Sequence, residues 1–197
     1  MTRFTWTFFA LLSLNFIHGQ IREAGTFEVV PVLGYSWANY YGNDGDPFGN
    51  INSINVGAHA DYYFDDRWSL RSGIFYQTMG ATVDAFKDKH SFLTIPLNMN
   101  WHFGGNRGWN LNFGPNFGYL VNTESTFNGQ ELLDSEPVRK VQAGISLGIG
   151  YKFAVSDNIS VLIDYQEQLA ITKVFKTSEI DLFNSFSSIN VGAVFSL

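Results

Sequence analysis

Residues 187–197, SSINVGAVFSL, end the chain without a charged residue or a proline. Alternate positions form an apolar set, which contains Ile189, Val191, Ala193, Phe195 and Leu197. The positions between them form a mostly polar set, which contains Ser188, Asn190, Gly192, Val194 and Ser196. This period of two predicts a β-strand with one apolar face. Because a long apolar strand at an open sheet edge would pair with other chains, we expect it to be covered or closed into a barrel.

The composition indicates one β-rich domain. The 197 residues include 19 glycines, 17% aromatic residues and only 15% charged residues, which is typical of short strands joined by turns. The net charge of −6, without a basic stripe, weighs against nucleic acid as a partner. Since the chain has no cysteine, disulfides and thiolate metal sites are excluded, and we predict no cofactor.

The first 20 residues, MTRFTWTFFALLSLNFIHGQ, have the pattern of a secretory signal peptide. A basic start at Arg3 precedes an apolar run from Phe4 to Ile17. We expect cleavage after Gly19, which divides the chain into a signal peptide, 1–19, and a β-barrel domain, 20–197. An uncleaved membrane anchor is the less favoured alternative, because the apolar run is short for a span.

Eight alternating segments follow, and we predict strands at about 27–40, 52–65, 68–80, 91–103, 109–121, 139–153, 159–170 and 186–197. The connections alternate between short ones, DDR, GGNRG and AVSDN, and longer polar ones, GNDGDPFGN, VDAFKDK, TFNGQELLDSEP and KTSEIDLFN. This rhythm predicts an all-β, eight-stranded antiparallel up-and-down transmembrane β-barrel of the bacterial outer membrane. Short turns and both termini would then be periplasmic, and the longer loops extracellular.

The two faces of these strands indicate which one meets lipid. One face carries no charge in the segments where we follow it, with residues such as Leu33, Ile95 and Leu147. The opposite face is polar and rich in Gly and Asn, and includes Asn98, Asn112 and Lys140. A soluble, lipocalin-like barrel would need this second face as its solvent surface, for which it has few Lys or Glu. We therefore predict a polar lumen and an apolar outer wall.

Aromatic residues near the strand ends fit two membrane-interface girdles. The group beside the short turns contains Phe64, Trp68, Trp101, Phe103, Trp109, Tyr151 and Phe153. The group nearer the long loops contains Trp37, Tyr76, Tyr119 and Tyr165. The alternative is that these rings pack in the core of an ordinary β-sandwich.

The chain end also looks like the C-terminal insertion signal of outer-membrane barrels, through Asn190, Gly192, Phe195 and Leu197. Four stretches, FLTIPLNMNWHFG, FGPNFGYLV, AGISLGIGYKF and ISVLIDYQEQLAIT, resemble the small porin-like, PorT-type outer-membrane β-barrel proteins of Bacteroidota. The resemblance implies an integral outer-membrane protein that contacts lipid and lipopolysaccharide. The insertion signal implies the barrel-assembly machinery as a partner during insertion. The resemblance supplies no catalytic residue.

Charged residues on the polar face predict a network in the lumen. The hairpin centred near Asp66 places Asp61 opposite Arg71 as an ion pair, with Glu28 near it and His102 adjoining. Lys152 and Asp164 complete the predicted network. We favour a structural role, because a narrow lumen must be filled, over a plug or gate for small solutes.

Enzymatic and metal sites have weaker support. A lipid-modifying site would need His90 and Ser91, with Asp84 or Asp88, but neighbouring strand residues point to opposite faces. The loop Asn43–Asn50 lacks the downstream Glu of a calcium loop, and the histidines are scattered.

We therefore predict a non-enzymatic structural or interaction protein that acts through acidic extracellular loops, with an unidentified outer-membrane protein as a possible partner. These loops could also bind divalent ions beside lipopolysaccharide. The alternatives are a narrow porin-like channel and, more remotely, a lipid A-modifying enzyme.

Overall fold

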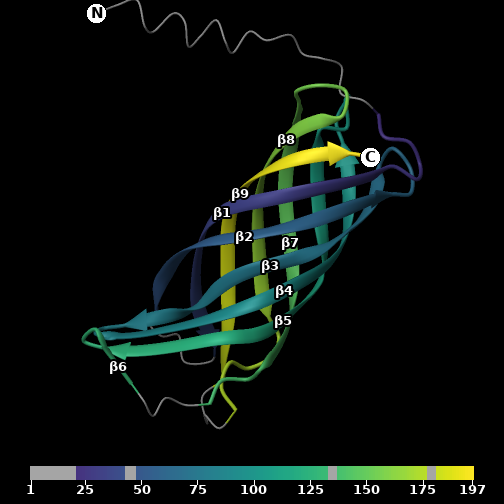
Figure 1. Ribbon diagram of the computed structural model, residues 1–197. Coiled ribbons are helices and arrows are strands. Elements are labelled where there is room, and N and C mark those ends of the chain that lie inside the picture. The colour runs from purple at the N-terminus through teal and green to yellow at the C-terminus, as the bar shows by residue number, and fades with distance from the viewer. Residues whose placement is uncertain (1–20, 43–47, 133–136, 177–180) are drawn as a thin grey trace, which may run out of the picture.

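The computed structural model describes residues 21–42, 48–132, 137–176 and 181–197, so the predicted signal peptide and its cleavage site lie outside the described residues. Nine strands form one sheet (Figure 1), and they are β1 (Phe27–Gly42), β2 (Gly49–Tyr63), β3 (Trp68–Val83), β4 (Phe86–Phe103), β5 (Trp109–Phe127), β6 (Gln130–Glu131), β7 (Val141–Ala154), β8 (Ile159–Ala170) and β9 (Leu182–Ser196). Within the described ranges there is no helix long and apolar enough to cross a membrane.

The sheet closes on itself into a barrel. β1 pairs antiparallel with β2 on one side and with β9 on the other, so Leu33 lies opposite Val56 and also opposite Val191. β4 pairs with β5, which completes the ring, while the two-residue β6 pairs only with the end of β5. The predicted fold, an eight-stranded antiparallel up-and-down barrel, is confirmed, and the apolar chain end is its closing strand.

We call the end of the barrel with the turns at 64–67, 104–108 and 155–158 the short-turn end, and the opposite end the long-loop end. The prediction that VDAFKDK forms a long loop is wrong. β3 continues to Val83 and β4 begins at Phe86, so only Asp84 and Ala85 form the turn, with Asp84 at φ 50°. The charges in this stretch are typical of a loop, but aspartate tolerates the left-handed conformation that a tight hairpin needs.

A second hairpin also extends the wall at the long-loop end. β5 continues to Phe127, beyond its last pair with β7, Tyr119 opposite Val141. Asn128 and Gly129, both with positive φ, then turn the chain into β6. Figure 1 shows the ends of β3, β4 and β5 extending past the rest of the wall.

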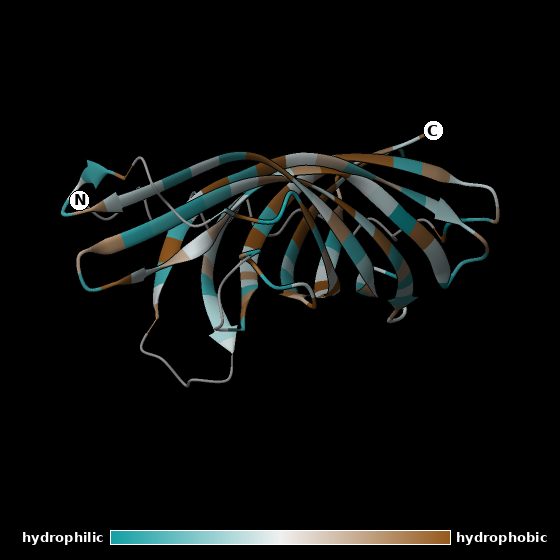
Figure 2. Ribbon diagram, turned by 90° about the horizontal axis from the view of Figure 1, so that it is seen from below, coloured by the Kyte–Doolittle hydropathy of each residue, from teal (hydrophilic) through white to brown (hydrophobic). Residues whose placement is uncertain are grey.

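The polarity of the barrel is inverted relative to a water-soluble protein. Outward side chains are apolar and open, with Leu33 60% and Ile145 58% exposed, whereas Glu28, Asp61 and Asn112 are fully buried inside. Bands of opposite hydropathy alternate along the strands (Figure 2).

Two charged residues qualify the predicted division of faces. Lys140, which we assigned to the lumen, is exposed just before β7, so that assignment is wrong. The strand begins at Val141, two residues later than the predicted start at 139. Glu167, which the predicted division left on neither face, belongs to the outward side of β8, between Tyr165 and Leu169.

Candidate functional site: the filled lumen

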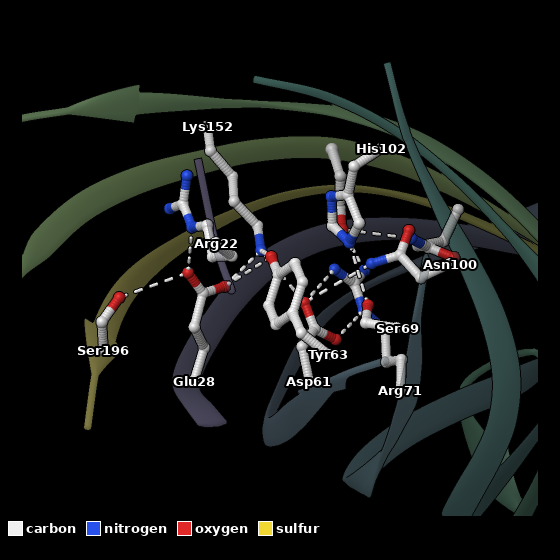
Figure 3. A network of polar contacts seen from close by, with 12 residues as sticks. Arg22, Glu28, Asp61, Tyr63, Ser69, Arg71, Asn100, His102, Lys152 and Ser196 are labelled. Atoms are coloured by element: carbon white, nitrogen blue, oxygen red, sulfur yellow. Dashed lines mark hydrogen bonds and ion pairs between the residues drawn. The ribbon is translucent and has the colours of Figure 1, made fainter. Parts of the chain in front are cut away.

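An ionic network fills the lumen toward the short-turn end (Figure 3). Asp61 on β2 and Arg71 on β3 lie opposite each other, and the guanidinium donates from Nε to Oδ1 at 2.8 Å and from Nη2 to Oδ2 at 3.0 Å. Both side chains are at most 3% exposed. The ion pair expected from the hairpin register is therefore present as a bidentate contact, the strong geometry for arginine and carboxylate.

Lys152 on β7 ties this pair to the first strand. Its Nζ donates to Glu28 Oε2, to Asp61 Oδ2 at 3.1 Å and to the Tyr63 hydroxyl at 2.8 Å. The second oxygen of Glu28 accepts from Arg22 Nε at 2.7 Å. Arg22 lies in the segment that precedes β1, so this segment contributes a side chain to the lumen.

The remaining predicted members join the same network from other strands. Asp164 on β8 accepts from Arg71 Nη1 at 3.5 Å and from Asn190 Nδ2 at 2.7 Å. His102 forms no ion pair with any residue that the structure describes; its Nε2 is 2.9 Å from Ser69 Oγ, and its ring stacks on Tyr63 with 4.7 Å between centroids. All six residues of the predicted network thus lie together.

The network is electrically balanced. Arg22, Arg71 and Lys152 supply three positive charges, and Glu28, Asp61 and Asp164 supply three negative ones. Buried charges are tolerated when they are paired and hydrogen-bonded, and each of these has at least one partner of opposite sign. The balance indicates a lumen built to hold these charges without an added ion.

Sequence reasoning missed two members, Arg22 and Tyr63. Arg22 precedes the first strand, and no periodicity places such a residue. Tyr63 has the same parity on β2 as Asp61, so the alternation that selected Asp61 could have found it.

Beyond the ionic network, the middle of the lumen holds a polar cavity of about 30 Å³. Four buried polar atoms at its lining residues have no hydrogen-bond partner in the protein, and they are Asn55 Oδ1, His59 Nε2, Gln77 Oε1 and Gln168 Oε1. The volume corresponds to about two water molecules. Glycine makes room for the amides here, since a Cβ on Gly34 would lie 2.0 Å from Asn190 Oδ1.

Apolar side chains close the lumen toward the long-loop end. Ala38, Met79, Phe92 and Phe186 form one buried cluster. A second cluster combines wall residues with side chains from the connecting segments, and it contains Tyr40, Ala81, Val138, Val174 and Leu182, with Phe48, Leu120 and Phe175 against it. A β-bridge between Val138 and Phe175 joins the two connecting segments.

The candidate enzymatic pair is not assembled. His90 Nε2 lies 2.8 Å from the Tyr40 hydroxyl and its Nδ1 2.8 Å from Thr123 Oγ1, whereas Ser91 Oγ bonds Thr78 at 3.2 Å. The part of the chain that the structure describes contains no group of three or more His, Asp or Glu side chains placed to hold a metal. Most of the loop Asn43–Asn50 lies outside the described residues.

Residues of the predicted insertion signal have different surroundings. Asn190 is buried in the lumen against Asp164, and Gly192 is also on the inner side. Phe195 and Leu197 are 41% and 80% exposed on the outward side. Their role in insertion stays a prediction.

Comparison with known proteins identifies the class to which this barrel belongs. The model of the family "Outer membrane protein beta-barrel domain" matches residues 7–195, and the chain belongs to this family. It is therefore an outer-membrane β-barrel protein, with an integral outer-membrane location. A search of curated proteins gives no match.

Solved structures agree on the fold. OprG from Pseudomonas aeruginosa is 11% identical, with 89% of this chain and 97% of OprG covered at a TM-score of 0.56. Neisserial surface protein A is 13% identical, with 87% and 98% covered at 0.52. The N-terminal barrel domain of P. aeruginosa OprF is 12% identical, with 88% and 100% covered at 0.51. At these identities the likeness extends to the fold alone.

Proposed function

We propose that this protein is a non-conducting outer-membrane barrel with a structural or interaction role carried by its long-loop end, and that it is not an enzyme. The observation that carries the proposal is a lumen filled at three successive levels: the ionic network, the Phe92 and Phe186 cluster, and the apolar cluster around Tyr40 and Phe175. An eight-stranded barrel is just wide enough for side chains to fill it.

Solute passage would require all three levels to open. The ionic level is anchored from β1, β2, β3, β7 and β8 at once, so moving one side chain leaves other charges without partners. The apolar levels would have to expose buried aromatic rings to water. We therefore favour a role in which these residues fill the lumen permanently over a role in which they open and close as a gate.

The long-loop end has the features of an interaction surface. The β3–β4 and β5–β6 hairpins extend past the wall, and Phe127 and Val121 are 49% and 45% exposed beside acidic Glu124 and Glu131. Exposed apolar side chains with a charged border are typical of sites for another protein. We propose that this end is extracellular, that both termini are periplasmic, and that the chain is one of the porin-like, PorT-type barrels of Bacteroidota.

A narrow channel is the second candidate, because the polar cavity lies inside the lumen. Conductance across planar bilayers separates the two functions. We expect no stepwise current from the purified wild-type barrel or from Arg71→Ala, because the apolar levels stay closed. Stepwise currents from the wild type would overturn the proposed function and favour the channel.

The interaction role has its own test. Covalent cross-linking in native outer membranes, followed by purification and mass spectrometry, should recover a recurrent outer-membrane protein with the wild type. Phe127→Ser should reduce its recovery, while Phe113→Ser on the outer wall serves as the control. Equal recovery with all three proteins would contradict a role for the projecting hairpins.

A further inference from the structure

Glu167 is a carboxylate on the wall of the barrel that faces lipid. Along β8 the inward residues Asp164 and Gln168 line the cavity, while Tyr165 and Leu169 on either side of Glu167 are 38% and 45% exposed. Glu167 pairs in register with Leu147 on β7, which is 52% exposed. The neighbours of Glu167 along β8 and across to β7 thus place its side chain outside the lumen.

Three hydroxyl groups hold this carboxylate. Tyr165 donates to Oε2 at 2.5 Å, Ser187 Oγ donates to the same oxygen at 2.7 Å, and Ser185 Oγ is 3.4 Å from Oε1. A carboxylate accepts hydrogen bonds through both oxygens, and these hydroxyl groups use both of them. Ser187 is only 7% exposed although it is on the outward side. We call Glu167 and the residues around these hydroxyl groups the polar patch.

No cation in the described ranges pairs with the carboxylate of the patch. Among the residues that the structure describes, no Lys, Arg or His forms an ion pair with Glu167, and Lys173, in the segment after β8, is paired with Asp181. A charge on a lipid-facing wall costs free energy that rises with depth in the membrane, and a positive partner from outside the chain would offset this cost. A single carboxylate is a poor site for Ca²⁺, which takes six to eight oxygen ligands.

The surroundings of Glu167 fit an ammonium group. The rings of Trp37 and Tyr165 lie 6.2 Å apart beside the carboxylate, since Trp37 and Glu167 both pair with Ser187. Aromatic faces attract ammonium ions, most strongly tryptophan. A carboxylate that accepts a hydrogen bond, next to two such rings, therefore selects a cation that carries N–H groups.

The patch also lies close to the long-loop rim of the barrel. Glu167 lies three residues before the end of β8, which places it about 8 Å below the long-loop rim for a strand tilted by about 40°. Asn39 and Ser185, which pair across β1 and β9, continue the polar surface toward the rim. A headgroup can enter along this line without crossing hydrocarbon.

We propose that this patch, formed by Asn39, Ser185, Ser187 and Glu167 with the rings of Trp37 and Tyr165, binds a primary ammonium group on a lipid headgroup of the leaflet at the long-loop end. Phosphatidylethanolamine, which carries such a group, serves as the probe. The ammonium donates to Glu167 and lies against the aromatic rings, while the acyl chains follow the outer wall. The interaction makes one patch of the β8–β9–β1 wall selective for a headgroup.

Native mass spectrometry of the barrel released from nanodiscs tests this proposal. Nanodiscs would contain equal phosphatidylethanolamine and phosphatidylglycerol, or equal phosphatidylethanolamine and phosphatidylcholine, whose ammonium has no N–H. We expect the wild type to retain phosphatidylethanolamine about tenfold over either competitor, the range of a hydrogen bond to a charged group. Glu167→Gln, which keeps the shape, should reduce this preference to near one.

Glu124→Gln, an exposed carboxylate on β5, is the matched control and should keep the preference. Trp37→Leu should lower it without changing the carboxylate, which keeps the test informative if Glu167→Gln folds poorly. The proposal is overturned if the wild type shows no headgroup preference or if Glu167→Gln and Trp37→Leu both retain it. A lipid-free dimer as the main species would also overturn it, because the patch would then face a second copy.

Discussion

Lys152 on β7 reaches Tyr63 on β2, with 2.8 Å between Nζ and the phenol oxygen. These two strands are not neighbours in the barrel wall, so the contact crosses the lumen. The same ammonium also contacts Glu28 and Asp61, and the Tyr63 hydroxyl donates to Glu28 at 3.0 Å. One lysine therefore links β7 across the lumen to the adjacent strands β1 and β2, which the sheet itself does not bring next to β7.

Replacing this lysine should be costly. Lys152→Met leaves Glu28 with Arg22 as its one cationic partner among the described residues and removes one of the two cations at Asp61, so we expect a loss of about 3–5 kcal/mol in the free energy of unfolding. Urea titration of the barrel refolded in lipid vesicles measures the change. Lys87→Met, at an exposed position of β4, is the control and should change stability by less than about 0.5 kcal/mol. A similar small loss for Lys152→Met would mean that the cross-lumen contact contributes little.

The Asp61 and Arg71 pair should show strong coupling in a double-mutant cycle. Either single change, Asp61→Asn or Arg71→Met, leaves a buried charge with fewer partners, and the double change removes both. We therefore expect the double variant to be more stable than the sum of the single losses predicts, by about 1–3 kcal/mol. Additive losses in the same urea titration would contradict direct coupling.

A methyl group at Gly34 should disturb the lumen amides. An added Cβ would lie 2.0 Å from Asn190 Oδ1 and 2.5 Å from Asn55 Oδ1, so both side chains must move. We expect Gly34→Ala to cost about 1–3 kcal/mol, as overpacking does. Gly105→Ala, where an added Cβ meets no atom within 4 Å, should leave the urea midpoint almost unchanged. Equal midpoints for the two variants would show that the side chains of Asn55 and Asn190 can move away from Gly34 at little cost in free energy.

Much of this architecture could be predicted from alternation alone, because each strand is buried on one side only. The parity of Asp61, Arg71 and Lys152 follows from the pattern, and the hairpin register that places Asp61 opposite Arg71 follows from the short turn. The pattern does not predict which inward residues of distant strands contact one another. The contact of Lys152 with Tyr63 depends on the tilt and stagger of the closed barrel, which no local pattern encodes.

Two other features escape sequence reasoning for physical reasons. Glu167 has the parity of the outer wall, but its hydroxyl partners come from β9 as well as β8, so only the register of that pair makes a charge there tolerable. The hairpin around Asp84 resembles a loop because its charges are those of a solvated strand beyond the membrane. The Asn128–Gly129 turn, by contrast, carries a recognisable hairpin signal that the predicted loop TFNGQELLDSEP contains.

The apolar cluster in the middle of the lumen gives a further prediction. Phe186 is fully buried with Met79, Ala38 and Phe92, and its truncation to alanine leaves a cavity that the sheet cannot collapse to fill. We expect Phe186→Ala to lower the free energy of unfolding by about 3–5 kcal/mol in vesicles. It should nevertheless carry no stepwise current, because the ionic network below it and the Tyr40 cluster beyond it remain in place. The combined variant Phe186→Ala with Arg71→Ala, measured under the same bilayer conditions, keeps one level closed and should also be silent. If the combined variant conducts and Phe186→Ala does not, the ionic network and the Phe186 cluster block the lumen, and the Tyr40 cluster does not.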